Sequence, residues 1–457
     1  MKRLTCLLLA IILTLTPLCA FANDEAFYSE NFKSSGILIY EARSDSVLFV
    51  NNHQKPYSPG SITKLLTCLV MLENMSLDEK VTATSEMLSL VEPNSSLAGI
   101  VSGESLTVGQ LVYAMLLPSG NDASKVAAVG CGRVILGDKN AKTKDAYNAF
   151  IKAMNDKAAE LGMTNSNFTN SDGYDDPESY STAEDVLKLA MAAYSNETIS
   201  EIAAKSHRYL ETNRRTHNWY STNMLLYKND PDTDAKNANY DSRVKGLKTG
   251  FTDIDGRCFS LVADDGEMVI YGVFLGMGFT SSKMWSYIKK TVSTAYDSYY
   301  TLDLMEGLPE EYTYNIKNYS MFSDESITLV PADTQENQIL LMNAEDDPNY
   351  ISFMIDNPEI CTIKKAGTTN ETGTIKLEKN VKEGDIVSYM LIFDADGEAE
   401  IGRMAYVATK NVAKYNAVDF IIRVVLPIVI MVALVIIIKK LKEYDNKIRK
   451  KDGRKTT

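Results

Sequence analysis

The chain has 457 residues, of which 45% are hydrophobic and 23% are charged, and its formal net charge is −13. This length suits two folded domains and an anchor. Setting aside the two positive charges of residues 1–22 and the net six of residues 439–457 leaves −21 for residues 23–438. So acidic a surface argues against nucleic acid, or another anionic polymer, as the main ligand.

The first 22 residues have the three parts of a cleavable secretory signal. Lys2 and Arg3 precede an apolar core, residues 7–15, which is followed by a small-residue cleavage site, Ala20-Phe21-Ala22. We therefore expect a signal peptide over residues 1–22 that is removed from the mature protein.

A serine and a lysine stand three positions apart in Ser61-Ile62-Thr63-Lys64. Residues 57–60 predict a turn before them, and the apolar run of residues 65–72 predicts a buried helix after them. Residues three apart on a helix share a face, so Lys64 can lie beside the Ser61 oxygen and take its proton. Lysine is a base only when neutral, and we expect burial and a second cation, Lys248, to lower the pKa of Lys64.

A second short motif, Ser119-Gly120-Asn121, follows a predicted helix over residues 106–117 that Thr107 caps. Pro118 breaks that helix, which predicts a loop between helices with Ser119 and Asn121 facing a cleft. A helix-capping turn without a catalytic role is the alternative.

The third motif, Lys248-Thr249-Gly250, precedes a predicted hairpin of two strands, residues 257–263 and 268–275. An edge strand carrying Lys248 and Thr249 would offer a cation, a hydroxyl and backbone groups to an extended peptide. Histidine is the more usual base for a serine, but none of the three lies beside a Gly-x-Ser-x-Gly turn. We expect surface or packing roles for these histidines, which are His53, His207 and His217.

The three motifs, in this order, resemble the S-x-x-K, S-x-N and K-T-G signature of penicillin-interacting serine enzymes. Over roughly residues 30 to 300 the chain resembles one family among them, the D-alanyl-D-alanine carboxypeptidases of the low-molecular-mass penicillin-binding proteins, peptidase family S11. Residues 36–42, 119–123 and 246–252 follow that family closely. The resemblance implies an α/β (α+β) penicillin-binding-protein/β-lactamase-like transpeptidase fold over residues 23–303.

The resemblance also implies a reaction, removal of the terminal D-alanine from peptidoglycan stem pentapeptides through a serine acyl-enzyme, and acylation by β-lactam antibiotics. It assigns the nucleophile to Ser61, the general base to Lys64 and a proton relay to Ser119. It implies no metal and no other cofactor. The chain also lacks H-E-x-x-H and paired-cysteine spacings, which argues against a zinc carboxypeptidase.

Substrate binding is implied for the remaining motif residues. Asn121 would hydrogen-bond the substrate backbone, and the Lys248-Thr249-Gly250 motif would hold the terminal carboxylate. The backbone N–H groups of Ser61 and Phe251 would form the oxyanion hole.

Two rival functions share this signature. A β-lactamase of related fold would need a deacylating glutamate in a Glu-x-x-x-Asn spacing between the second and third motifs, and none occurs from Asn121 to Lys248. A non-catalytic penicillin-binding sensor is the other rival, and the intact motifs argue against it.

Short alternating segments separated by acidic and Gly-containing turns occupy residues 304–412. They predict a small β-sandwich, with strands such as residues 326–330, 351–355, 374–377 and 386–393. Its expected role is that of a spacer; partner binding is the alternative, and no motif supports it.

Residues 418–438 are apolar apart from Asp419 and Arg423 and are long enough to span a bilayer. Residues 439–457 hold nine Lys or Arg against three acidic residues, which places this tail in the cytoplasm and the catalytic domain outside. An in-plane amphipathic anchor is the alternative, but apolar residues surround this helix, which favours a membrane span.

Four cysteines remain after the signal: Cys68, Cys131, Cys258 and Cys361. Their spacing forms no disulfide framework, and apolar neighbours indicate that Cys68 and Cys258 are buried thiols. A disulfide among the four stays open.

Overall fold

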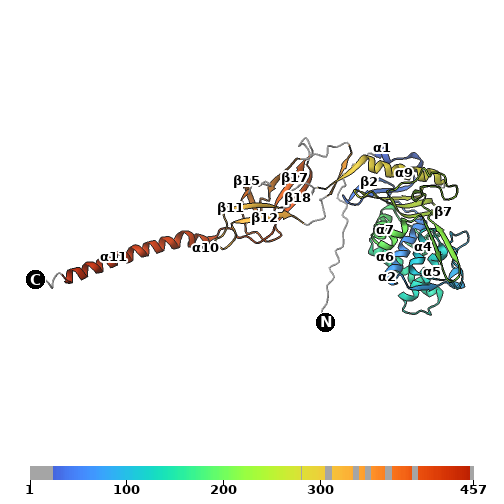
Figure 1. The fold of residues 1–457 in the computed structure, drawn as a ribbon, viewed down its shortest axis with the longest axis horizontal. Coiled ribbons are helices and arrows are strands. Elements are labelled where there is room, and N and C mark those ends of the chain that lie inside the picture. The colour runs from blue at the N-terminus through green and yellow to red at the C-terminus, as the bar shows by residue number, and fades with distance from the viewer. Residues whose placement is uncertain are drawn as a thin grey trace. The chain divides into compact units, whose positions relative to one another are not determined.

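The computed structural model describes residues 24–278, 280–303, 311–332, 339–344, 351–365, 373–393 and 400–452. The predicted signal peptide lies outside these residues, as do residues 453–457 of the basic tail. The chain divides into two compact units (Figure 1), one running to Thr301 with Leu341–Ala344, the other comprising Leu302–Leu340 and the chain from Glu345 on.

A five-stranded antiparallel sheet in the order β2-β1-β9-β8-β7 forms the centre of the first unit. Its strands are β1 (Gly36–Glu41), β2 (Ser46–Asn51), β7 (Val244–Thr252), β8 (Gly256–Asp264) and β9 (Val269–Leu275). The predicted hairpin is confirmed as β8 and β9. Among the described strands, β7 is an edge of this sheet, as the sequence predicts for the strand with the third motif.

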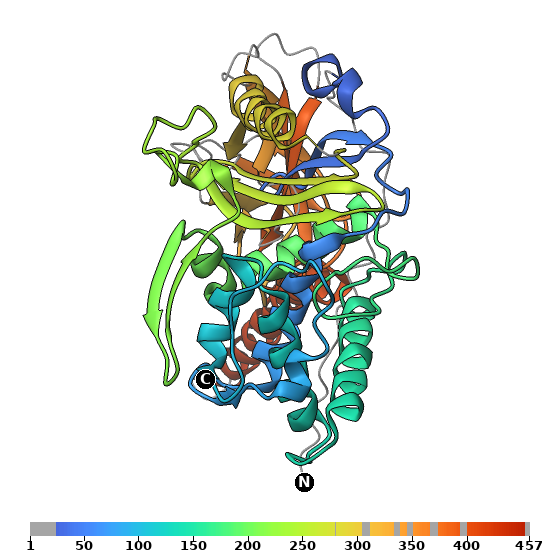
Figure 2. The same cartoon turned by 90° about the vertical axis from the view of Figure 1, so that its right-hand side faces the viewer.

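Alternate residues of the sheet contribute to two different hydrophobic cores, because successive side chains of a strand point to opposite faces. In β1, Leu38 and Tyr40 pack in the larger core with the helices of one face, while Ile37 and Ile39 pack in the other core with α9 (Ser281–Ser298). Figure 2 shows the sheet between these helices. Burial on both faces explains why the strands are nearly continuous in apolar residues.

The helices of the larger core are α2 (Thr63–Asn74), α4 (Val108–Leu116), α5 (Asn121–Ile135), α6 (Thr143–Glu160), α7 (Ala183–Ser195) and α8 (Glu197–Ala203). Short helices complete the unit: α1 (Asp24–Phe27), η1 (Glu30–Phe32), η2 (Gly60–Ile62), α3 (Ser85–Leu88) and η3 (Met224–Leu226). The remaining strands are β3 (Lys80–Thr82) paired with β4 (Ser105–Thr107), β5 (His207–Glu211) paired with β6 (Thr216–Tyr220), and β10 (Tyr299–Asp303).

The predicted cap of α4 is confirmed, because the Thr107 hydroxyl accepts from the Gln110 N–H and the Gln110 side chain accepts from the Thr107 N–H. The expectation for the second motif needs one correction. Ser119 lies in the predicted loop, but Asn121 is the first residue of α5. Gly120 therefore ends the loop, and Asn121 takes its direction from a long helix.

The second unit contains a seven-stranded sheet in the order β14-β17-β18-β12-β11-β16-β15. The β-rich domain expected there is present, with its strands hydrogen-bonded in one continuous order. They are β11 (Tyr312–Ile316), β12 (Ser326–Pro331), β14 (Ile351–Asp356), β15 (Cys361–Lys365), β16 (Gly373–Leu377), β17 (Ile386–Phe393) and β18 (Glu400–Ala408); β13 (Ile339–Asn343) lies outside this sheet.

A long helix follows the β-rich sheet. It comprises α10 (Ala417–Phe420), a π-helical segment (Ile421–Val425) and α11 (Leu426–Asp452), and Figure 1 shows α11 continuing from α10. Among the described helices, only the stretch Ala417–Tyr444 is long and apolar enough to cross a membrane. Asp419, a residue of the predicted span, lies in the first turn of this helix, but it is fully buried and hydrogen-bonded to Ser320 and Met321.

Candidate active site

The Ser61 motif begins at a turn that packs against strand β7. Gly60 has φ +52°, and a Cβ on it would lie 3.3 Å from the backbone nitrogen of Phe251. Glycine meets both demands, the left-handed backbone and the close approach of β7. Ser61 follows in the 3₁₀ turn η2, which leads into α2, and its side chain is half-buried.

The third motif also lies close to Ser61, through Gly250. A Cβ on Gly250 would lie 2.3 Å from the Cys258 sulfur and 3.0 Å from the Ser61 backbone nitrogen. The Cys258 thiol, in turn, donates to the Pro59 carbonyl at 3.0 Å. Gly250 and Cys258 thus determine how closely β7 and β8 approach the turn before Ser61, here called the serine turn. The sequence did not predict this role of Cys258.

Lys64 is fully buried, and its ammonium nitrogen lies 2.7 Å from the Ser61 hydroxyl oxygen. It also lies 2.8 Å from the Asn121 side-chain oxygen and 2.8 Å from the Asp172 carbonyl oxygen. Burial lowers the pKa of Lys64 to about 8, although the Asp172 carboxylate acts in the opposite direction. About one tenth of Lys64 is therefore neutral at pH 7, far more than for an ordinary lysine, and this neutral form can act as a base.

The second motif reaches this centre through Asn121, whose side-chain nitrogen also donates to the Ser95 hydroxyl at 3.1 Å. Ser119 is buried and has φ +61°, a left-handed conformation that costs a non-glycine residue about 1 kcal/mol or more. Its hydroxyl makes no hydrogen bond to any described residue. The structure thus joins Asn121 to Lys64 and Ser61, but Ser119 is not bonded to them.

Lys248 of the third motif is buried, and its ammonium donates to the Thr249 carbonyl at 2.9 Å. Burial and the neighbouring Lys64 cation lower the pKa of Lys248 well below its ordinary value. The Thr249 hydroxyl contacts the Thr222 hydroxyl. Among the described residues no ion pair includes Lys248, so this lysine has no carboxylate partner in the part of the chain that the structure describes.

Four further side chains lie behind Lys64, and the sequence did not predict this cluster. Lys125, also buried, lies 3.1 Å from an Asp172 carboxylate oxygen, 3.0 Å from a Glu92 oxygen and 3.2 Å from the Tyr147 hydroxyl. Asp172 is fully buried and offers its backbone carbonyl to Lys64. Lys125 lies one turn after Asn121 on α5, and that spacing was the only sequence signal for it.

The histidines agree with the packing and surface roles expected of them. His217 is buried, with a ring nitrogen 2.6 Å from a Glu104 carboxylate oxygen, and it packs against Trp219. His53 is partly exposed and His207 is exposed. All four cysteines that follow the signal lie among the described residues, and all are buried free thiols.

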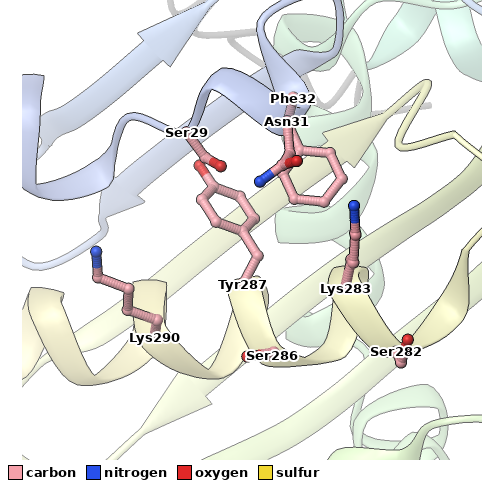
Figure 3. Close-up of a pocket in the computed structure, with 8 residues that line it drawn as sticks. All are labelled: Ser29, Asn31, Phe32, Ser282, Lys283, Ser286, Tyr287 and Lys290. Carbon is pink, nitrogen blue, oxygen red and sulfur yellow. The ribbon is translucent and has the colours of Figure 1, made fainter.

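A separate pocket of about 400 Å³ lies between the N-terminal segment and α9 (Figure 3) and contains no motif residue. It is lined by Ser29, Asn31, Phe32, Ser282, Lys283, Ser286, Tyr287 and Lys290.

The profile of the peptidase S11 family, D-alanyl-D-alanine carboxypeptidase, matches residues 23–278. D-alanyl-D-alanine carboxypeptidase DacF of Bacillus subtilis (strain 168) is 29% identical over 313 residues, which are 66% of this chain and 72% of DacF. The D-alanyl-D-alanine carboxypeptidase of Streptomyces sp. (strain K15) is 30% identical over 227 residues, 48% of this chain and 72% of that protein.

Solved structures show the same fold. The Streptomyces K15 DD-transpeptidase superposes with a TM-score of 0.50 at 27% identity, over 56% of this chain and 95% of that chain. D-alanyl-D-alanine carboxypeptidase DacD from Francisella tularensis superposes with a TM-score of 0.56 at 22% identity, over 83% and 93% of the two chains, a likeness of fold alone.

The N-terminal part therefore has the DD-transpeptidase fold of penicillin-binding proteins, followed by a β domain and a long apolar helix. The family match covers more than half of the chain. The protein belongs to peptidase family S11, the D-alanyl-D-alanine carboxypeptidases related to low-molecular-mass penicillin-binding proteins.

Proposed function

We propose that this protein is a membrane-anchored serine D-alanyl-D-alanine carboxypeptidase that removes the terminal D-alanine from peptidoglycan stem pentapeptides and is acylated by penicillin. One observation carries the proposal, the 2.7 Å contact between the Ser61 hydroxyl and a buried lysine with a lowered pKa. That pair supplies a nucleophile and its base in one place.

In the acylation step the Ser61 oxygen attacks the carbonyl carbon of the penultimate D-alanine, and neutral Lys64 takes the hydroxyl proton. The tetrahedral intermediate then breaks its C–N bond, and the nitrogen of the terminal D-alanine receives a proton as it leaves. We assign to the Ser119 hydroxyl the role of passing this proton from Lys64 to the leaving nitrogen. This hydroxyl makes no hydrogen bond to a described residue and is free to rotate. Water then hydrolyses the ester, and Ser61 regains its proton.

The carbonyl oxygen becomes negatively charged in the intermediate. The backbone N–H groups of Ser61 and Phe251 are the proposed donors to it, each worth about 3 to 4 kcal/mol in other acyl-transfer enzymes. The close approach of Gly60 and Gly250 supports this assignment, because it brings β7 next to the serine turn.

Lys248 and Thr249 are the proposed ligands of the terminal carboxylate, and Gly250 lets this part of β7 lie close to Ser61. Burial disfavours the charged form of Lys248 in the free protein, and an entering carboxylate would favour that form again. Asn121, fixed by Lys64 and Ser95, would hydrogen-bond the substrate backbone. No metal or other cofactor takes part in these steps.

The expected location is the outer face of a bacterial cell membrane. The signal-like residues 1–22 would export the chain, and the helix within Ala417–Tyr444 would hold it by a single span. The basic residues after 438 favour a cytoplasmic tail, with both folded units outside.

D-alanine release from a peptide ending in L-Lys-D-Ala-D-Ala tests the activity. The wild-type protein in detergent should release D-alanine, and Ser61→Ala should release none while keeping its melting temperature. Acylation by penicillin without any D-alanine release would instead indicate a non-catalytic sensor, and rapid penicillin hydrolysis would indicate a β-lactamase.

A further inference from the structure

The long C-terminal helix is joined to the β-rich unit without a free linker. The Tyr415 N–H donates to the Asn318 carbonyl at 2.7 Å, and the Ser320 N–H donates to the Ala413 carbonyl at 2.8 Å. The Ala413 N–H donates to the Ser323 hydroxyl at 2.9 Å. The segment before the helix is therefore paired with residues 318–323 between β11 and β12, here called the β11–β12 turn.

Asp419, in the first turn of the helix, binds the same β11–β12 turn. Its carboxylate is fully buried and accepts from the Ser320 hydroxyl at 2.8 Å, from the Met321 N–H at 2.7 Å and from the Asn416 N–H at 2.9 Å. Hydrogen bonds to a charged acceptor are the stronger kind. They fix the start of the helix relative to this turn.

Arg423 lies one helical turn after Asp419 and is in contact with two aromatic rings. Its guanidinium carbon lies 5.1 Å from the ring centre of Tyr319 and 5.8 Å from that of Tyr415. Both distances suit cation–π contact. Tyrosine and arginine are typical of the membrane–water interface, so this cluster indicates the level of the outer membrane surface.

The length of the apolar helix also places the outer membrane surface near Arg423. Residues 424–438, all apolar, extend about 22 Å at 1.5 Å per residue. The hydrocarbon core of a bilayer is about 30 Å thick, so the apolar stretch is short for it. A short span draws the membrane surface toward the residues at its ends. On the outer side those residues are Arg423 and the β11–β12 turn that it contacts.

The β11–β12 turn carries two exposed apolar side chains at this place. Phe322 is 73% exposed and Met321 is 39% exposed, and the Met321 N–H is bound to Asp419 of the helix. Phe322 is the most exposed large apolar side chain among the described residues. Its position beside the start of an apolar helix distinguishes it from a scattered surface residue.

We propose that the β11–β12 turn is a second membrane contact, in which Met321 and Phe322 insert into the headgroup layer of the outer leaflet beside the helix. The occupant of this surface is lipid, because the turn is hydrogen-bonded to the helix that the bilayer surrounds. The inference rests on the proposed membrane anchor. It gives the β-rich unit a fixed orientation on the membrane, beyond the role of a spacer.

Tryptophan fluorescence in lipid nanodiscs tests the contact. Full-length Phe322→Trp is compared in nanodiscs of ordinary and of brominated lipid, which quenches tryptophan at the bilayer. The native residues Trp219 and Trp285 are buried in the first unit, and the wild-type protein supplies their background. Glu311→Trp is the matched control, because Glu311 is exposed and lies at the far end of β11 from the turn.

The expected result is quenching of the added Phe322→Trp emission, with none for Glu311→Trp. Unquenched emission from Phe322→Trp in protein that stays in the nanodisc would overturn the contact and leave the anchor standing. Quenching at both positions would overturn it too, because it would show lipid contact without preference for the turn. Extraction of the full chain by alkaline carbonate would overturn the anchor itself, and D-alanine release, measured separately, reports on the proposed activity.

Discussion

The carboxylate of Asp172 lies 3.1 Å from the Lys125 ammonium, while the backbone carbonyl of the same Asp172 accepts a hydrogen bond from Lys64. The buried ion pair thus holds the carbonyl that orients the proposed base. Its two charges also act on Lys64 in opposite senses, since Asp172 raises the pKa of Lys64 and Lys125 lowers it.

Replacing Lys125 by methionine should shift the pH dependence of acylation. Without Lys125 the Asp172 carboxylate is unopposed, so the pKa of Lys64 rises above about 8 and less neutral base is present at pH 7. Penicillin acylation rates are measured from pH 6 to pH 10. In the wild type the rate should increase around pH 8, and in Lys125→Met the same increase should occur at a higher pH. Breaking this buried pair should also cost about 3 to 5 kcal/mol of stability.

The double variant Lys125→Met with Asp172→Asn is the control. It removes both charges but keeps the backbone carbonyl at position 172. The pH at which the acylation rate increases should therefore return toward the wild-type value. An unchanged pH profile in folded Lys125→Met would show that the pair does not act on Lys64.

Binding of a carboxylate substrate should take up protons. The pKa of Lys248 is well below its ordinary value in the free protein, and an adjacent carboxylate stabilises the charged form, so binding should raise that pKa. Calorimetry of Ser61→Ala with a D-Ala-D-Ala peptide at pH 8, in buffers of different ionisation enthalpy, should show net proton uptake. The uptake should disappear in Ser61→Ala with Lys248→Met; proton release, or no exchange, would contradict the assignment of Lys248.

Gly250→Ala should lose acylation by at least about 10²-fold, the effect of removing an oxyanion donor. The new Cβ would lie 2.3 Å from the Cys258 sulfur and 3.0 Å from the Ser61 nitrogen. Adding Cys258→Ala removes the first clash but not the second. The double variant should therefore recover melting temperature without recovering the acylation rate, and recovery of both would show that the approach to Ser61 is not critical.

The stability of the β-rich unit in a chain truncated before the apolar helix should depend on the residue at which the chain ends. A chain ending after Lys414 lacks Tyr415 and Asp419, and so loses the hydrogen bonds that these residues make with the β11–β12 turn. A chain ending after Phe420 keeps them. Both should release D-alanine, but the shorter chain should show a lower melting temperature for its β-rich unit. Equal melting temperatures would mean that Asp419 does not stabilise the turn.

The sequence predicted the site residues by their spacing, and the structure brings most of them together. Ser61 and Lys64 share a helical turn, and the predicted hairpin places Lys248 on an edge strand. These features are local, or follow from strand pairing over short stretches of chain, which is why patterns in the sequence could indicate them.

Other features depend on contacts between distant segments, which patterns in the sequence indicate weakly or not at all. The Asp172 carbonyl that binds Lys64 is a backbone group, so its residue type carries no information about it. Lys125 has the sequence appearance of any helical lysine. Asp419 was predicted within the membrane span because its neighbours are apolar, but its three hydrogen-bond donors belong to Asn416 and to the β11–β12 turn.

Identification of the acylated residue is the most direct test of Ser61 as the nucleophile and Lys64 as its base. The full-length protein is treated with penicillin and analysed by intact-mass spectrometry, followed by peptide mapping. One penicillin adduct on Ser61 is expected in the wild type, with none in Ser61→Ala and almost none in Lys64→Ala, because the nucleophile then lacks its base. An adduct on another residue would contradict the assignment of Ser61, and acylation of Lys64→Ala at the wild-type rate at pH 7 would contradict that of Lys64.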